Sequence, residues 1–284
     1  MDHTNNTTIE EARQNLANLM KDNELEVPVL PKVANDILFM SEDANANISE
    51  LSKLIHQDQS IAGRVLKIAN SAAFASSERI VSLQQAVARL GMQLLSEIAL
   101  SVAVQGNVFN SPRYKKEIQL LWRHALASAV YGKEVARFLR KNVEGHYLCG
   151  LLHAIGKPVA LKTIENFENE HNIQLERETV IEMMDEFHVS IGVYVTGKWN
   201  LPRTVQVANE HYKDYSNAPE FKQETAITYL ADKLAENLVF PEQIQEKDLL
   251  FDPVFEELNI YPQDRKGLLE KKEEVQAVVN SMDF

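Results

Sequence analysis

Apolar residues recur with the 3.6-residue period of an α-helix in nearly every segment of this chain. The segment TTIEEARQNLANLM, residues 7–20, places Ala12, Leu16 and Leu19 on one face, and its two threonines are typical helix caps. The same period governs PKVANDILFMSED, ISELSKLIHQ and SIAGRVLKIANSAAF. No pair of alternating β-branched runs flanks an Asn-Gly or Asp-Gly turn, so no hairpin is predicted. The pattern therefore predicts an all-α protein in which helices pack on helices.

Boundaries between the predicted helices are marked by prolines and capping residues. Residues 23–31, NELEVPVLP, should be extended, because Pro28 and Pro31 push the residues before them out of the α region. Asp58 is placed to cap the helix that follows it. We expect Asn70 to end that helix in a left-handed turn.

The helices divide into four segments. FNSPRYKKE, residues 109–117, is a polar break of the kind found at subdomain boundaries, and a long helix over 118–141 should follow it. The predicted division is a helix at 1–23, an N-terminal helical subdomain at 24–110, a second helical subdomain at 111–240, and a helical extension at 241–284.

Charge and composition exclude several classes of protein. The net charge of −12 argues against electrostatic binding to nucleic acid or to anionic lipid. The N-terminus has neither the basic nor the apolar region of a signal peptide, and no apolar run reaches the roughly 18–20 residues of a membrane span. Cys149 is the one cysteine, so it cannot form an internal disulfide and should behave as a small buried hydrophobe. We expect a cytoplasmic protein with no nucleic-acid or membrane partner.

Candidate chemistry comes from histidines of the second subdomain. His124, for example, shares a helix face with Ala127, Tyr131 and Val135 and should point inward. A single inward histidine is usually an ordinary core residue. Several of them with an aspartate, on separate helices, indicate a converging polar site, and a metal ion is one way to satisfy such a group. The candidates are His124, His153, His188, His211 and Asp232.

The motif LLHAIGK resembles the LLHDIGK of the HD-superfamily phosphohydrolases. A longer series of motifs resembles the HDOD domain: D...IAGRVLKIANSAAF, then ARLG, GLLH and KWNLP, in that order. The HDOD domain is a bacterial relative of those enzymes and is usually attached to signalling systems. The resemblance runs from about Leu30 to about Asp232. It implies a multi-helix bundle of HD-superfamily type with an N-terminal helical subdomain.

The resemblance also implies roles for the candidate residues. His124 matches the first metal-binding histidine, His153 the histidine of the His-Asp doublet, and Asp232 the later aspartate. His188 and His211 resemble the extra histidines of some two-metal members. A vestigial site, or a single-metal site for zinc or iron, is compatible with these ligands.

Ala154 departs from the superfamily pattern at the second position of the doublet. An alanine has no lone pair to offer a metal. The carboxylate that catalytic members supply there, and that can bridge two ions, is therefore missing. A hard divalent cation should bind less tightly, and a two-metal hydrolytic site is hard to assemble.

Two functions remain open, and the residues favour the first. One is a non-catalytic regulatory module that binds a signalling partner encoded elsewhere, or a small ligand in the vestigial pocket; it would have no catalytic residue. The other is a metal-dependent phosphohydrolase of a nucleotide or cyclic dinucleotide, with His188 and His211 replacing the lost carboxylate. Ala154 and the absence of a clear Lys/Arg phosphate clamp favour the regulatory module. Lys157, beside the doublet, is expected to be a helix C-terminal lysine.

Hydrophobic residues elsewhere in the chain are predicted to have packing roles. Trp122 and Trp199 should be core anchors. In the extension, one further amphipathic helix should pack on the body or on a second copy of the chain, which would give a homodimer. Its apolar residues are Leu268, Leu269, Val275 and Val278.

Overall fold

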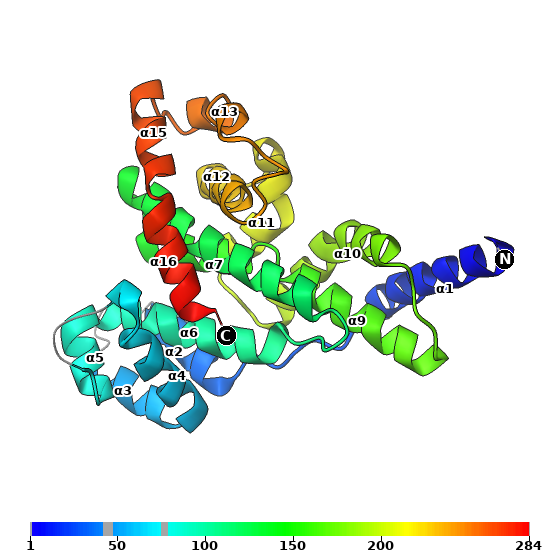
Figure 1. The fold of residues 1–284 in the computed structure, drawn as a ribbon, viewed down its shortest axis with the longest axis horizontal. Coiled ribbons are helices and arrows are strands. Elements are labelled where there is room, and N and C mark those ends of the chain that lie inside the picture. The colour runs from blue at the N-terminus through cyan, green and yellow to red at the C-terminus, as the bar shows by residue number, and fades with distance from the viewer. Residues whose placement is uncertain (1, 42–47, 75–78, 284) are drawn as a thin grey trace.

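A computed structural model of the protein describes residues 2–41, 48–74 and 79–283 (Figure 1). All regular elements in these residues are helices, so the predicted all-α fold is confirmed. None of the described helices combines the length and the hydropathy needed to cross a bilayer.

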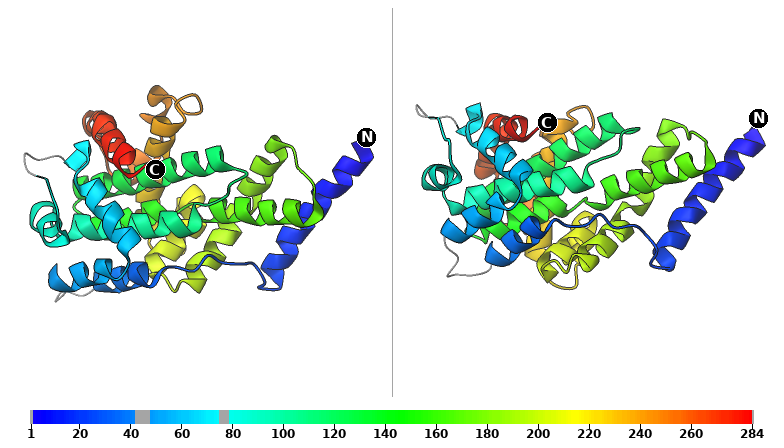
Figure 2. Two further views of the ribbon diagram at one scale, coloured as in Figure 1. Left: turned by 60° about the horizontal axis from the view of Figure 1, so that its bottom comes forward. Right: turned by 90° about the horizontal axis from the view of Figure 1, so that it is seen from below.

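The chain begins with α1 (Asp2–Lys21), which packs against α9 and α10 at one end of the molecule (Figure 2). The prediction that Thr7 and Thr8 cap this helix is wrong, because the helix already starts at Asp2. Threonine costs well under about 1 kcal/mol inside a helix, so the two residues do not stop it. An extended arm over residues 24–31 then runs along the body to α2, as predicted, and Trp199 Nε1 donates a hydrogen bond to the arm at Pro28 O, 2.9 Å away.

The segment predicted to be an N-terminal subdomain, residues 24–110, is in its described part a group of short helices around the longer α6 (Figure 1). Its elements are α2 (Lys32–Ser41), α3 (Ile48–His56), α4 (Gln59–Ala69), the 3₁₀ turn η1 (Ala72–Phe74), α5 (Leu83–Leu90) and α6 (Met92–Val108). Residues 42–43 of the helix predicted after Pro31 lie outside the described residues.

Asp58 caps α4 as predicted, since its Oδ1 accepts hydrogen bonds from the backbone N–H groups of Ser60 and Ile61 at 2.9 and 3.1 Å. The left-handed turn predicted at Asn70 is wrong, because its φ is −96°. Its side chain instead bonds both the N–H and the C=O of Ile80, each at 2.8 Å. Asn70 therefore ties the end of α4 to the start of the next segment.

The second subdomain surrounds α7, which lies at the centre of the molecule and packs on α8 and α12 (Figure 1). Its elements are α7 (Lys115–Phe138), α8 (Val143–Leu152), α9 (Gly156–His171), α10 (Arg177–Lys198), α11 (Arg203–His211), η2 (Tyr212–Asn217) and α12 (Lys222–Val239). The helix predicted over 118–141 begins and ends three residues earlier. It stops because Arg140 adopts a positive φ of 57°, and Lys141 N–H then returns to Ala136 O.

The C-terminal extension holds four helices where one was predicted: α13 (Glu246–Leu249), α14 (Val254–Glu257), α15 (Pro262–Glu270) and α16 (Lys272–Met282). Leu268, Leu269 and Val275 are buried and Val278 is partly buried, so this apolar surface packs on the body, split between α15 and α16. Helix α16 contacts both α7 and η1, and Met282 O accepts a hydrogen bond from the buried Trp122. A homodimer and the four-part division of the chain stay predictions.

Candidate functional site

Three of the five predicted site residues meet inside the second subdomain. His124 comes from α7, His153 directly follows α8, and Asp232 comes from α12, and all three are buried. Asp232 Oδ1 lies 3.0 Å from His153 Nε2 and 3.3 Å from His124 Nε2. One ligand atom of each residue lies within 4.8 Å of the other two. We refer to these residues as the His/Asp cluster.

Glycine makes this convergence sterically feasible. A Cβ on Gly150 of α8 would lie 2.3 Å from the backbone oxygen of Ser128 on α7, so only glycine allows the two helices this close. At the start of α9, a Cβ on Gly156 would lie 1.8 Å from His188 O on α10. The segment that carries His153 is thus pressed against α7 on one side and α10 on the other.

Asn209 holds the C-terminal end of α8. Its side-chain amide donates to the backbone oxygens of Leu152 and His153, at 2.9 and 2.8 Å. Carbonyls at a helix end lack partners within the helix, so this buried amide satisfies groups that would otherwise be unpaired. Sequence analysis missed Asn209, although it lies among the apolar positions of its own helix, where a buried amide must bond to something.

The contacts of His153 determine where its proton lies. Its Nδ1 is 2.7 Å from Gly150 O, and only an N–H can bond to a carbonyl oxygen, so Nδ1 carries the proton. In the neutral ring, the Nε2 lone pair then faces the carboxylate of Asp232. Their 3.0 Å separation is attractive only with a second proton, or another cation, between them.

The pKa values of the other two members of the cluster are shifted by burial and by neighbouring charges. It lowers the pKa of His124 to about 3, against the opposing charge of Asp232, so this imidazole is neutral at physiological pH. Burial alone would raise the pKa of Asp232, but the hydrogen bond and charge of His153 hold it below its ordinary value. Without the second proton on His153, the cluster presents one carboxylate and two imidazole lone pairs to a shared point.

This donor set fits a divalent transition metal. His124 Nε2 is buried and has no hydrogen-bond partner, although it lies near the carboxylate oxygen. Two imidazole nitrogens and a carboxylate oxygen are ordinary ligands of zinc and iron. A cation held by the three residues would satisfy both the orphaned nitrogen of His124 and the lone pair of His153.

His188 lies beside the cluster but outside this ligand group. It is buried, and its Nε2 lies 3.2 Å from the hydroxyl of Tyr212. The Tyr212 ring packs edge-on against the ring of His153, with centroids 4.8 Å apart. Tyr212 thus contacts both His188 and His153, and the sequence pattern gave no signal for it.

His211 does not point inward as predicted. Its side chain is 25% exposed and lies 3.7 Å from the carboxylate of Glu210 on the surface. Helix α11 ends at His211 and the chain turns into η2, so the helical phase that placed His211 inside no longer applies. The adjacent Tyr212 takes the inward position.

Lys157 lies at a helix start, which corrects the prediction of a C-terminal lysine. Gly-Lys-Pro does not stop a helix here, because proline is tolerated in a first turn and α9 begins at Gly156. Lys157 Nζ pairs with Asp185 Oδ1 at 3.0 Å. Burial, followed by the charges of Lys213 and Lys157, lowers the pKa of His188 to about 4.

Comparison with known proteins identifies the domain type. The family model described as the HDOD domain matches residues 27–215. A solved HDOD domain protein of unknown function from Geobacter sulfurreducens is 21% identical, with a TM-score of 0.73 over 96% of this chain and 98% of that one. A candidate metal-dependent phosphohydrolase from Shewanella amazonensis is 19% identical, with a TM-score of 0.70 over 96% and 99%.

Two further relatives are longer than this chain. A candidate signal transduction protein from Marinobacter aquaeolei is 19% identical, with a TM-score of 0.68 over 97% of this chain and 66% of that one. An uncharacterized protein from Treponema pallidum is 28% identical over 224 residues, which are 76% of this chain and 43% of the relative. At these identities, the solved structures establish a shared fold.

Proposed function

This chain belongs to the HDOD domain family, and we propose that it is a non-catalytic regulatory module of bacterial signal transduction. In this proposal the helical body binds a signalling protein or a small ligand, and the His/Asp cluster is what remains of a metal centre. The names of the structural neighbours include both a signal transduction protein and a phosphohydrolase, so the choice between these functions depends on the residues of the site.

The observation that carries the proposal is the composition of the cluster. Three side chains supply ligand atoms, and the residue after His153 is the half-buried Ala154, which supplies none. Hydrolysis by two metal ions needs anionic ligands that hold both ions and offset their charge. Asp232 is the one carboxylate of the cluster, and His188 and His211, which were candidates to replace the missing group, lie outside it.

A single metal ion is compatible with this function. His124, His153 and Asp232 would hold it. A bound divalent metal supplies positive charge that can polarise a ligand oxygen or cross-link helices. In this chain the three residues come from α7, the end of α8 and α12, so their joint attraction to a cation would hold these segments together.

Metal analysis combined with an activity assay tests the proposal. The protein is purified without chelator, loaded with zinc, iron or manganese, and incubated with a generic phosphodiester and a cyclic dinucleotide. His153→Ala is the matched variant, because it removes one cluster ligand. We expect no hydrolysis above that of His153→Ala with any metal. Turnover that requires both metal and His153 would establish the phosphohydrolase instead.

A further inference from the structure

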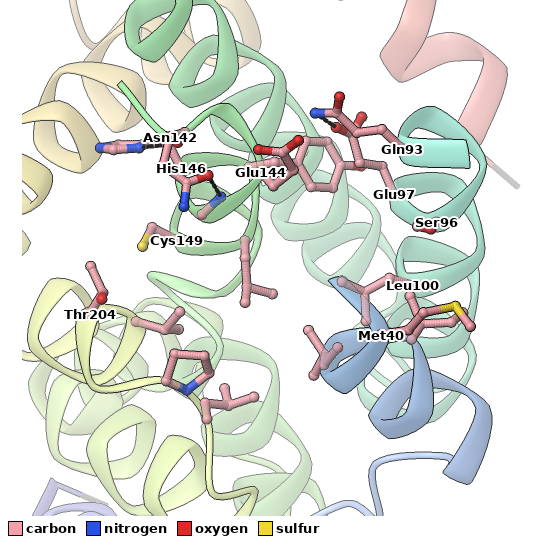
Figure 3. Close-up of a pocket in the computed structure, with 18 of the residues that line it drawn as sticks. Met40, Gln93, Ser96, Glu97, Leu100, Asn142, Glu144, His146, Cys149 and Thr204 are labelled. Carbon is pink, nitrogen blue, oxygen red and sulfur yellow. Dashed lines mark hydrogen bonds between the residues drawn. The ribbon is translucent and has the colours of Figure 1, made fainter. Parts of the chain in front are cut away.

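A second candidate site lies between the two subdomains. A solvent-open cavity of about 800 Å³ is lined by α2 and α6 on one side and by α8 and the start of α11 on the other (Figure 3). None of the three His/Asp cluster residues lines it. Small-molecule sites commonly have volumes of about 300–1,000 Å³ and occur between structural units. The cavity therefore has the size and the position of a ligand site.

The walls of the cavity combine an apolar surface with carboxylates. Met40 and Leu100 on one side face Leu148 and Pro202 on the other. Three glutamates also line it, each from a different helix: Glu97 of α6, Glu144 of α8 and Glu224 of α12. Lys141 is the cationic residue that the lining contributes. A ligand would thus contact aliphatic surface along its length and negative charge at several points.

The three carboxylates of the cavity differ in their ion-pair partners. Glu97 is buried, and Lys133 Nζ lies 2.5 Å from it. In the described part of the chain, neither Glu144 nor Glu224 has a salt-bridge partner. Burial raises the pKa of Glu97 against the opposing charge of Lys133, and the negative charge of Glu144 adds to this rise.

Glu224 provides a second acidic position in the cavity. Its charge acts on His146 and on Cys149, which are both residues of α8 that line the cavity. The acidic residues therefore come from three helices that line the cavity: Glu97 from α6, Glu144 from α8 and Glu224 from α12. A ligand that carries two cations would pair the carboxylates of Glu144 and Glu224.

We propose that this cavity binds an aliphatic amine that carries at least two ammonium groups. The methylene chain packs on Met40, Leu100 and Leu148, and the ammonium groups bond to Glu144 and Glu224. Because α8 carries Glu144 in its first turn and ends next to His153, the ligand contacts the same helix that positions the His/Asp cluster. The inference does not depend on the proposed function, since an amine could bind whether or not the cluster is catalytic.

Calorimetric titration with spermidine tests the proposal. Glu144→Gln and Glu224→Gln each remove a carboxylate of the cavity, and Glu178→Gln removes an exposed carboxylate of α10 that does not line it. We expect saturable binding to the wild type and to Glu178→Gln, and an affinity about tenfold lower in each cavity variant. The neutral chain analogue 1,8-octanediol should not bind.

Two further measurements separate the cavity from the rest of the acidic surface. Met40→Lys adds a cation to the half-buried wall and should abolish spermidine binding, while a thermal melt verifies that the variant is folded. Equal affinity in Glu224→Gln and Glu178→Gln would indicate general attraction to a chain of net charge −12 and would overturn the proposal. The absence of saturable binding to the wild type would overturn it as well.

Discussion

The Oδ1 atom of Asp232 lies 3.0 Å from the Nε2 atom of His153, although these residues are 79 positions apart in the chain. The other ring nitrogen of His153 donates to Gly150 O, so Nε2 and the carboxylate share a proton or a cation.

Restoring a carboxylate beside the cluster should strengthen metal binding. We expect Ala154→Asp to bind zinc about tenfold more tightly than the wild type, because one more negative charge lies near the cation. The affinity is measured by competition with a chromogenic chelator, starting from metal-free protein. Ala277→Asp adds the same charge at an exposed position of α16 and should leave the affinity unchanged. Equal affinities of Ala154→Asp and Ala277→Asp would contradict the prediction.

Gly150 should be required for the close packing of α7 and α8. A Cβ at this position would lie 2.3 Å from Ser128 O, and backbone cannot move aside as a flexible side chain can. We expect Gly150→Ala to lower the free energy of unfolding by about 2 kcal/mol or more, as overpacked cores do. Urea denaturation followed by circular dichroism measures the change.

The matched control for this substitution is Gly63→Ala in the exposed face of α4. A Cβ there would meet no atom within 4 Å. Because alanine favours the helix, this variant should gain about 0.5–1 kcal/mol. If Gly63→Ala and Gly150→Ala both lost stability, the loss in Gly150→Ala could not be assigned to the close packing of α7 and α8.

His188 should make the protein sensitive to acid. Burial, then Lys213 and Lys157, lower its pKa in the folded state to about 4, below the value of about 6.5 expected in the unfolded chain. The unfolded state therefore binds the proton more readily, so the stabilisation is complete above pH 6.5 and is lost as the pH falls towards 4. The difference corresponds to at most about 3 kcal/mol for this group.

Comparison of variants isolates this contribution. We expect the free energy of unfolding of His188→Gln to fall less steeply than that of the wild type between pH 6.5 and 4, as measured by urea denaturation at several pH values. His56→Gln, which removes an exposed histidine of α3, controls for the loss of a histidine as such. Parallel curves for the wild type and His188→Gln would refute the assignment.

Helical periodicity was enough to predict the all-α fold, and the ordered motifs were enough to predict the family. The same reasoning placed His124, His153 and Asp232 in one site. The prediction that His211 points inward is wrong, because periodicity assumes that a helix continues, whereas α11 ends at that residue. Tyr212 and Asn209 were missed because their partners are a distant ring and two backbone oxygens, which only the tertiary arrangement brings near. The cavity was missed because helices far apart in the sequence line it, and their relative placement leaves no local pattern.

Asn209 should fix the end of α8, and through it the position of His153. Asn209→Asp keeps the shape of the side chain but replaces its N–H donors with an oxygen that faces two backbone oxygens. Each buried carbonyl left without a donor costs about 1–3 kcal/mol, so we expect a loss of about 2–4 kcal/mol in the free energy of unfolding. The loss should become smaller at low pH, because a protonated aspartate regains one donor. Asn110→Asp makes the same change at an exposed position and should cost little. If urea denaturation gave the two variants the same stability, the amide of Asn209 would not hold the end of α8.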